Sequence, residues 1–233
     1  MARSSTPAAR GWFITIEGPD GGGKTTQAQR LLAHLETAGR LVRLTREPGG
    51  TWLGERLREV LLARTEDTAG AAAEPLTEAF LFNAARRQLV GEVIRPALAA
   101  DITVICARFA DSTLAYQGYG AGVALDRLRS LAQISTDGLT PDLTILLDLP
   151  VEAGLARKEL ADVTRFEAEF DLGFHRRVRD GFLELASAEP ERFIVIDATR
   201  TLDEVAAAIA SAVDARMAAT PEPIVSAGTA TAG

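Results

Sequence analysis

The chain has 233 residues, of which 47% are hydrophobic, so it is long enough to bury a substantial core as one domain. Its formal net charge of −7 argues against a general nucleic-acid-binding protein, which needs a basic surface. The single cysteine, Cys106, excludes a disulfide within the chain and a zinc cluster, and no apolar stretch approaches the length of a membrane span. We therefore expect a cytoplasmic protein that binds neither nucleic acid nor a membrane.

The two ends of the sequence have compositions typical of disordered segments. Residues 1–10 are basic and serine-rich without the apolar region of a signal peptide, and residues 219–233 are rich in Ala, Thr, Pro and Gly. We expect a disordered leader and a disordered tail on either side of one domain at 11–218.

Short apolar runs of strand length alternate with amphipathic helical patterns along this domain. The runs lie at residues 12–16, 41–45, 102–106, 143–147 and 193–196. Apolar strands separated by helices predict an α/β fold with a five-stranded parallel sheet covered by helices on both faces. Ligands of such sheets bind beyond the carboxyl ends of the strands, so the residues that follow each run are the ones to examine.

The first run is followed by a phosphate-loop motif, Gly18-Pro19-Asp20-Gly21-Gly22-Gly23-Lys24-Thr25-Thr26, which fits G-x-x-x-x-G-K-[ST] at every fixed position. A helical pattern comes next, so strand, loop and helix stand in the order that the motif requires, and a chance glycine-rich turn is disfavoured. Main-chain N–H groups of such a loop converge on phosphate oxygens at a helix N-terminus. Lys24 should reach the β- and γ-phosphates and the Thr25 hydroxyl should ligate Mg²⁺, which predicts a nucleoside-triphosphate site.

Charged and aromatic residues follow the next two strands. The segment 46–51 follows the second strand. Its Pro and Gly residues explain a turn, but the charged pair Arg46 and Glu47 at the strand end is not explained by a turn alone. In the helical stretch 75–99, Phe82 and Arg86 share a face, and an aromatic ring beside a planar donor suits a nucleobase, although core packing explains most of that stripe. Arg108 stands at the end of the third strand, where a phosphate is the economical partner for its charge.

Two further groups have more than one interpretation. Residues 112–117 place hydroxyl and amide groups at helical spacing, which is consistent with binding a sugar or base without being specific to it. Basic residues in the segment 157–166 flank a short break between helices and look like a lid that closes over phosphates. An exposed helix–loop–helix with ordinary surface charges fits that charge pattern equally well.

Together these motifs resemble thymidylate kinases of the bacterial type, from about Phe13 to Ala215. The most specific segments are residues 46–51, the pair Phe82 and Arg86, and residues 111–118. The resemblance implies a P-loop NTPase fold with a short lid, and transfer of the γ-phosphoryl group of ATP to dTMP to give dTDP. It also implies Mg²⁺ as cofactor and a homodimer.

The same resemblance implies a set of dTMP-binding residues, namely Asp20, Glu47, Arg58, Phe82, Arg86, Arg108, Thr113, Tyr116 and Gln117. Phe82 would stack on thymine and Arg86 would hydrogen-bond it. Tyr116 would crowd the 2′ position and so select deoxyribose, while Arg58 and Arg108 would bind the phosphate. Residues 18–26 would bind ATP, and Thr25 and Glu47 would serve the metal.

Members of the family supply a helper arginine either from the phosphate loop or from the lid. Here the loop positions are Gly21 and Gly22, so the lid must supply it, with Arg157 and Arg165 as candidates and Lys158 as a weaker one. The implied catalytic residues are Lys24, Arg108, Arg157 and Arg165. They would neutralise the charge that spreads over the transferred phosphoryl group.

The sequence departs from the family pattern at Ala107, where an Asp generally precedes the arginine, and at Thr164, where an acidic residue often precedes the lid arginine. A carboxylate at 107 would influence Mg²⁺ through its waters and orient Arg108. Its loss should lower the rate more than nucleotide binding, unless Glu47 or Asp111 compensates. The alternative is a catalytically impaired or non-catalytic nucleotide-binding protein of the same fold.

Overall fold

A computed structural model of the chain describes residues 10–63, 73–157, 164, 166, 168 and 170–219. Residues 1–9 of the expected leader, residues 220–233 of the expected tail and most of the expected lid lie outside the described residues. Lys158 and Arg165 are among the lid residues that lie outside.

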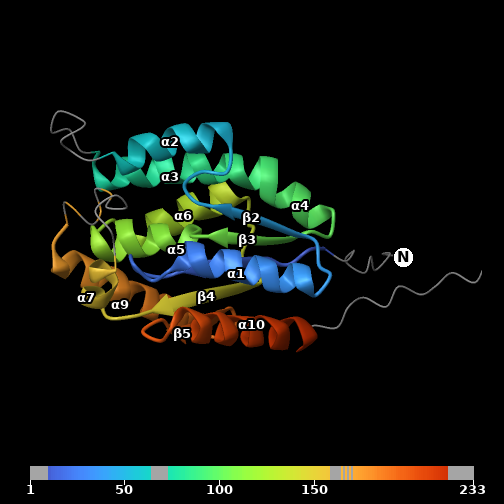
Figure 1. The fold of residues 1–233 in the computed structure, drawn as a ribbon. Helices are drawn as coiled ribbons and strands as arrows, with labels where there is room; N and C mark the ends of the chain where they lie inside the picture. Colours follow the sequence, from blue (N-terminus) through green and yellow to red (C-terminus); the bar gives the residue numbers. More distant parts are fainter. Residues whose placement is uncertain are drawn as a thin grey trace, which may run out of the picture.

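A five-stranded sheet forms the centre of the molecule (Figure 1). Its strands are β1 (Phe13–Glu17), β2 (Val42–Arg46), β3 (Thr103–Ala107), β4 (Leu143–Asp148) and β5 (Phe193–Asp197). All neighbours pair in parallel, in the order β2-β3-β1-β4-β5, which confirms the predicted sheet. The first three strands begin and end one residue later than predicted, because pairing with the neighbouring strand sets their ends and an apolar run does not reveal that pairing.

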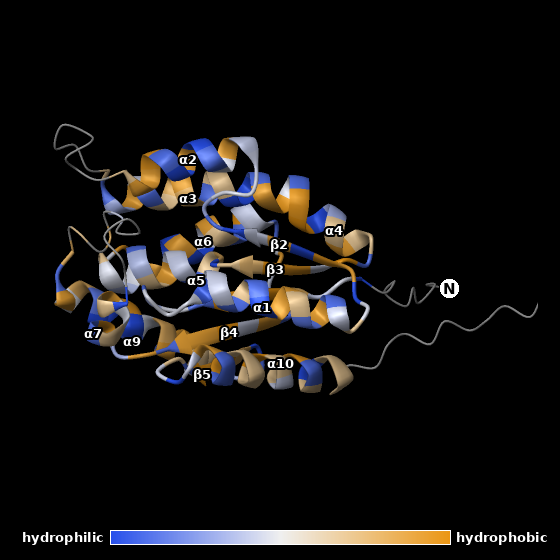
Figure 2. Cartoon of the chain, in the orientation of Figure 1, coloured by the Kyte–Doolittle hydropathy of each residue, from blue (hydrophilic) through white to orange (hydrophobic). Residues whose placement is uncertain are grey.

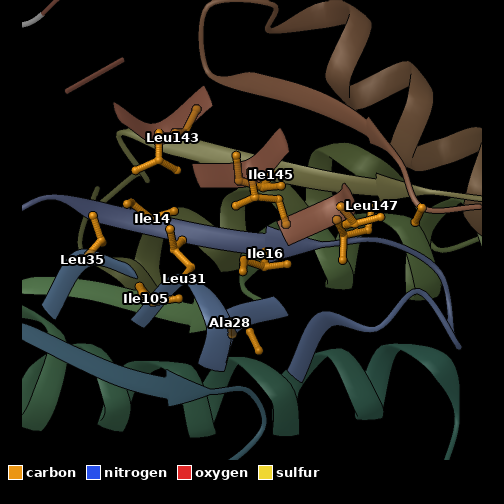
Figure 3. Packing of buried hydrophobic residues seen from close by; sticks show 14 of the residues in the cluster. Ile14, Ile16, Ala28, Leu31, Leu35, Ile105, Leu143, Ile145 and Leu147 are labelled. Atoms are coloured by element: carbon orange, nitrogen blue, oxygen red, sulfur yellow. The ribbon is translucent and has the colours of Figure 1, made fainter. Parts of the chain in front are cut away.

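One face of the sheet packs against α1 (Lys24–Thr37) and α10 (Leu202–Ala219). Figure 3 shows side chains from β1, β3 and β4 converging with those of α1, among them Ile14, Ile105, Ile145 and Leu31. Successive residues of a strand point to opposite faces, so Ile14 and Ile16 belong to this cluster whereas Phe13 does not. The phosphate loop therefore leads from the central strand directly into a helix anchored on this face.

The opposite face is covered by α4 (Arg95–Ala99), α9 (Leu172–Ala188) and the pair α5 (Ala110–Thr113) and η3 (Leu114–Gly120). Phe13 of β1 meets Phe109 edge-on, with ring centroids 4.9 Å apart. Figure 2 shows the central strands, largely hydrophobic, between helices that carry both hydrophobic and hydrophilic residues. Because both faces are covered, the three inner strands β1, β3 and β4 are buried along nearly their whole length, whereas the edge strands β2 and β5 are partly exposed.

The remaining helices complete the edges of the domain. They are α2 (Trp52–Leu62), α3 (Pro75–Leu89), η2 (Val90–Ile94), α6 (Leu125–Thr136) and α7 (Val151–Ala156). The predicted continuous helix over 75–99 is interrupted by the π-helical turn η2, which ends just before Pro96. Pro96 has no N–H to donate and its ring collides with the preceding turn of a regular helix, so the local change of hydrogen-bond pattern has a physical cause. Within the described ranges, no helix is both long and apolar enough to cross a membrane.

Candidate functional site

A cavity of about 870 Å³ opens among the segments that follow β1, β2, β3 and β5. Its walls hold most of the residues that the sequence singled out: Asp20, Gly21, Gly22, Gly23, Lys24, Thr25, Thr26, Glu47, Arg58, Phe82, Arg86, Arg108, Thr113, Tyr116, Gln117 and Arg157. Gly18 and Pro19 are not in the wall, but their carbonyl oxygens accept hydrogen bonds from Lys24 Nζ at 2.9 and 2.7 Å. The structure thus brings together all the predicted site residues that it describes.

The phosphate loop has a conformation that depends on its glycines. Gly21 has φ +73°, and a Cβ on it would lie 1.8 Å from the carbonyl oxygen of Gly154 in α7. No side chain fits there, so this loop position cannot carry an arginine. Gly23, with φ +81°, directly precedes the first residue of α1, Lys24. Thr25 and Thr26 follow in the first turn, exposed to the cavity.

Arg108 is held by several polar groups at the centre of the site. Its Nη2 lies 2.5 Å from Asp20 Oδ1 and donates to the Tyr116 hydroxyl at 3.2 Å. That hydroxyl in turn donates to Asp20 Oδ2 at 2.7 Å. Burial raises the pKa of Tyr116 well above its ordinary value, so the phenol stays neutral. The guanidinium is therefore fixed while one edge still borders the cavity.

Arg58 is a second cation in the same wall. It donates from Nη1 to the Pro48 carbonyl oxygen at 3.0 Å. Its burial lowers the pKa of its guanidinium, and the charges of Arg46 and Arg108 lower that pKa further. A cation whose charge is disfavoured by neighbouring cations in this way is favourably placed to bind an anion, because a phosphate would offset the repulsion.

Arg86 is almost fully buried, with 1% exposure, and is bonded on several sides. Its Nε and Nη2 lie 2.9 and 2.7 Å from Glu47 Oε2, and Nη2 also donates to Thr113 Oγ1 at 3.0 Å. Nη1 has one partner among the described residues, Asn83 Oδ1 at 3.1 Å, so it keeps a second N–H for a ligand. The guanidinium is thus locked in one orientation at the cavity wall.

Glu47 has one carboxylate oxygen that none of the described residues satisfies. Its Oε2 binds Arg86, whereas Oε1 is buried and has no hydrogen-bond partner in the described part of the chain. Burial raises the pKa of Glu47 and the charge of Arg86 opposes that rise. A buried acceptor without a donor is costly, so Oε1 is suited to a ligand hydroxyl or a metal-bound water.

An aromatic cluster of Phe82, Tyr116 and Phe166 forms part of the cavity wall. Phe166 lies 5.5 Å from Tyr116 and 6.5 Å from Phe82, measured between ring centroids. No pattern in the sequence singles out Phe166, because its place in the wall depends on the fold bringing α3, η3 and this segment together. Gln117, at the same wall, donates from Nε2 to Glu78 Oε2 at 3.2 Å, which orients its amide.

The wall near α10 contains residues that the sequence analysis did not select. Arg200, Thr201, Leu202 and Val205 line it, as does Gln27 of α1. Gln27 Nε2 donates to the Leu202 carbonyl oxygen at 3.0 Å, and its Oε1 has no partner among the residues that are described. The residues near Arg200 follow β5, so the strand-end rule already pointed to this segment.

Arg157 ends α7 and donates from Nη1 to the Ala198 carbonyl oxygen at 2.9 Å, at the rim of the cavity. Thr164 and Phe166 also border the cavity, so part of the expected lid segment reaches it. Arg165 lies outside the described residues.

The donor set of the cavity fits Mg²⁺ in its usual protein environment. The exposed Thr25 hydroxyl and the unsatisfied Glu47 Oε1 both belong to this wall. Over the ranges that the structure describes, no group of three His, Cys, Asp or Glu residues could hold a metal ion. One hydroxyl and one carboxylate, completed by water and substrate phosphates, are the ligands that Mg²⁺ commonly takes in phosphoryl-transfer sites.

Comparisons with known proteins agree with this geometry. A family model for thymidylate kinase matches residues 16–209. The thymidylate kinase of Deinococcus radiodurans is 54% identical over 208 residues, covering 89% of this chain and 98% of that protein. That of Geotalea uraniireducens is 49% identical over 215 residues, covering 89% of this chain and 99% of that protein. The crystal structure of the thymidylate kinase from Ehrlichia chaffeensis aligns with a TM-score of 0.71 at 34% identity, covering 88% of this chain and 98% of that chain.

Proposed function

This chain belongs to the thymidylate kinase family, and from this premise we propose that it transfers the γ-phosphoryl group of ATP to dTMP, producing ADP and dTDP. The observation that carries the proposal is the arrangement within one cavity. A phosphate loop forms one wall, the arginine pair Arg58 and Arg108 forms the next, and a base-sized aromatic wall adjoins them.

ATP would bind along residues 18–26, with its phosphates against the main-chain N–H groups at the start of α1. Lys24 would turn its ammonium group from the loop carbonyls toward the β- and γ-phosphates. The adenine would then lie toward Arg200 and Leu202, because that wall continues the cavity beyond Thr26.

The acceptor dTMP would occupy the other end of the cavity. Phe82 would stack on thymine, and the remaining N–H of Arg86 Nη1 would donate to a base carbonyl. Tyr116, held against Asp20 at 2.7 Å, would occupy the space that a 2′-hydroxyl needs. Glu47 Oε1 would accept from the 3′-hydroxyl side or from a metal-bound water.

The reaction would be an in-line displacement. A phosphate oxygen of dTMP forms a bond to the γ-phosphorus, the bond from the γ-phosphorus to the bridging oxygen breaks, and ADP leaves with that oxygen's electron pair. No general base is needed, because the attacking oxygen is already anionic. Thr25 and Glu47 would hold Mg²⁺ directly or through water, and the ion would neutralise phosphate charge.

Positively charged side chains of this chain would position the acceptor phosphate and stabilise the transferred phosphoryl group. Arg58 and Arg108 would fix the acceptor phosphate, and Lys24 would stabilise the charge at the transferred group. Since Gly21 admits no side chain, a helper arginine would come from the lid segment, with Arg157 at the rim and Arg165 as the candidates.

Ala107 motivates the competing hypothesis of a binding protein without turnover. Asp111 is unsuited to replace the missing acid, because both its oxygens accept from Arg192 at 2.7 and 2.9 Å. Asp20 pairs with Arg108 at 2.5 Å and so can orient it. This favours an active kinase in which Asp20 orients Arg108 in place of the missing acidic residue at position 107.

A coupled assay of ADP release with ATP, Mg²⁺ and dTMP tests the proposal, with Ala107→Asp as the matched variant. We expect turnover by the unchanged chain and a higher kcat for Ala107→Asp with a similar KM for ATP. If both forms bind ATP and neither converts dTMP, the binding-protein hypothesis is correct.

We also propose a homodimer, which the neighbouring helices α2, α3 and α6 would form. They expose large apolar side chains: Trp52 is 78% exposed, Val60 64%, Phe80 55% and Ile134 74%. Large apolar side chains exposed on adjoining helices favour an interface. Sedimentation equilibrium should give a dimer for the unchanged chain and a monomer for Trp52→Arg, and a monomeric unchanged chain at high concentration would contradict this. A cytoplasmic location, where ATP is available and Cys106 stays reduced, belongs to the same proposal.

A further inference from the structure

Glu17 is a fully buried carboxylate that the proposed reaction does not use. It is the last residue of β1 and directly precedes Gly18, where the phosphate loop begins. An ionised group in such a place is unfavourable unless donors compensate it, so its partners indicate what it stabilises.

The carboxylate binds the turn that follows β3. Its Oε1 accepts from the main-chain N–H of Phe109 at 2.7 Å and of Ser112 at 3.3 Å. Its Oε2 accepts from the Ser112 hydroxyl at 2.6 Å. One side chain on the central strand therefore closes the turn that connects the neighbouring strand to α5.

That turn holds Arg108 in a left-handed conformation, with φ 68°. A residue with a Cβ adopts this conformation only where its surroundings enforce it. The N–H of Arg108 donates to the Ile16 carbonyl oxygen at 2.9 Å, and the next N–H, that of Phe109, donates to Glu17. Two adjacent residues at the end of β1 thus fix the main chain on both sides of Arg108.

Ser112 extends this control to the guanidinium. Its hydroxyl donates to Glu17 and lies 3.3 Å from Arg108 Nη1, from which it accepts. The main chain and the side chain of Arg108 are therefore both tied to the same carboxylate.

We propose that Glu17 is a positioning residue for phosphoryl transfer, which holds the turn at Arg108 so that the guanidinium faces Asp20 and Tyr116. The inference rests on the proposed function, which places the phosphate of dTMP at Arg108. Only the ionised carboxylate accepts all three hydrogen bonds, because a carboxylic acid must use one oxygen as a donor.

The protonation of Glu17 therefore connects pH to the acceptor site. Burial raises the pKa of Glu17 from 4.5 to about 7, the charge of Asp111 raises it as well, and Ser112, Arg108 and the N–H of Phe109 oppose the rise. The three hydrogen bonds that Phe109 and Ser112 donate to the Glu17 carboxylate are therefore all formed above neutral pH, and they weaken as the pH falls and the carboxylate is protonated.

Among the described residues, three other charged or titratable groups face Glu17, and two of them keep their protonation state over this range. Arg108 keeps its charge, since Tyr116, Asp20 and Glu17 raise its pKa more than burial lowers it. Burial raises the pKa of the Cys106 thiol on β3, so it remains neutral. Asp111 is bound on its far side by Arg192 at 2.7 Å.

Glu17→Gln is the informative variant, because the amide keeps the size of the side chain and removes its charge and its titration. Its oxygen can still accept from Phe109, and its NH₂ can donate to Ser112 Oγ. The matched control is Asp142→Asn, which likewise replaces a carboxylate by its amide. Asp142 lies near the first residue of β1, where its Oδ2 accepts from the N–H of Phe13 at 2.7 Å. Thermal melts establish that each variant is folded.

The experiment measures the dissociation constants of dTMP and ATP between pH 6 and pH 8, together with kcat/KM for dTMP. At pH 8 we expect Glu17→Gln to bind dTMP about tenfold more weakly than the unchanged chain, with ATP binding within about twofold. At pH 6, where about a tenth of Glu17 is ionised, the difference should nearly vanish. The second ionisation of dTMP itself, near pH 6, cancels in this ratio.

Ser112→Ala provides an independent measurement, since it removes the link to the guanidinium and leaves the bond to Phe109. It should weaken dTMP binding in the same direction by a smaller factor. The proposal is overturned if Glu17→Gln binds dTMP within twofold of the unchanged chain at pH 8, or loses dTMP and ATP affinity equally. A chain that binds dTMP without forming dTDP would contradict the proposed function, while the affinity ratio would still decide the role of Glu17. A chain that binds no dTMP would overturn both.

Discussion

The buried pair of Arg86 and Glu47 makes a strong prediction about stability, which Arg86→Met tests. Met has a similar length and no charge, so the change leaves the Glu47 carboxylate buried with no partner among the described residues. Breaking a buried ion pair in this way typically destabilises a protein by about 3–5 kcal/mol. The lost bond to Thr113 at 3.0 Å adds to this cost, whereas Asn83 keeps a donor in Ser135.

The pH dependence of this cost follows from the titration of Glu47. Without Arg86, burial alone acts on the carboxyl and raises its folded-state pKa further above 4.5. The folded state then takes up a proton that the unfolded state releases, so the penalty is absent below pH 4.5 and grows as the pH rises. Holding a carboxyl neutral costs 1.36 kcal/mol per pH unit above its unfolded pKa, which sets a limit of about 5 kcal/mol at pH 8 and about 1 kcal/mol at pH 5.

Urea denaturation followed by circular dichroism measures the free energy of unfolding of the variant and the unchanged chain at pH 5 and at pH 8, and so the deficit at each pH. We expect the deficit of Arg86→Met to be several kcal/mol larger at pH 8 than at pH 5. The double variant Arg86→Met/Glu47→Gln should recover most of the loss and remove its pH dependence. A deficit that is below about 1 kcal/mol at pH 8, or equal at the two pH values, would refute the reasoning.

Four further predictions concern the proposed reaction and the buried carboxylate. Lys24→Ala should lower kcat by at least about 100-fold in the ADP-release assay, since it removes a cation from the β- and γ-phosphates, and a near-normal kcat would exclude that role. Phe82→Ala should raise KM for dTMP about 10- to 100-fold through lost stacking and leave KM for ATP within about twofold; equal effects would place the base elsewhere. Tyr116→Ala should narrow the ratio of kcat/KM between dTMP and its ribonucleotide analogue, and an unchanged ratio would argue against a steric role at the 2′ position. Glu17→Gln should stabilise the fold by about 3 kcal/mol at pH 8 and by less than about 0.5 kcal/mol at pH 4.5, because the folded-state pKa of about 7 lies above 4.5 and the buried anion is unfavourable only at higher pH. Urea denaturation at the two pH values measures this gain in unfolding free energy. A gain that does not depend on pH would show that the removal of a buried anion is not its cause.

The phosphate loop illustrates what a sequence can reveal. Its conformation depends on neighbouring residues, since Gly21 and Gly23 supply positive φ angles and Lys24 starts a helix. The parallel sheet was predicted for a similar reason, because apolar runs and amphipathic helices record local periodicity. Strand ends were displaced by one residue at β1, β2 and β3, since pairing with a neighbour determines them.

Residues that follow different strands were also predicted to meet, because the carboxyl ends of parallel strands share one edge of the sheet. Glu47, Arg108 and Tyr116, which follow β2 and β3, line one cavity in agreement with this rule, whereas Arg58 of α2 was expected there only from the family resemblance. Phe166 was not selected, because it approaches Phe82 only through the packing of separate segments.

By itself, the sequence determined the order of strands and helices, the phosphate loop and the family, because each of these depends on residues that are close together in the chain. Only the tertiary structure decided which partners the buried charges have. Glu17 meets Phe109 across 92 residues of sequence, and Arg86 meets Glu47 across 39. Such pairs leave no periodic trace, since a single buried carboxylate looks like any other Glu until the fold removes water from it and supplies its donors.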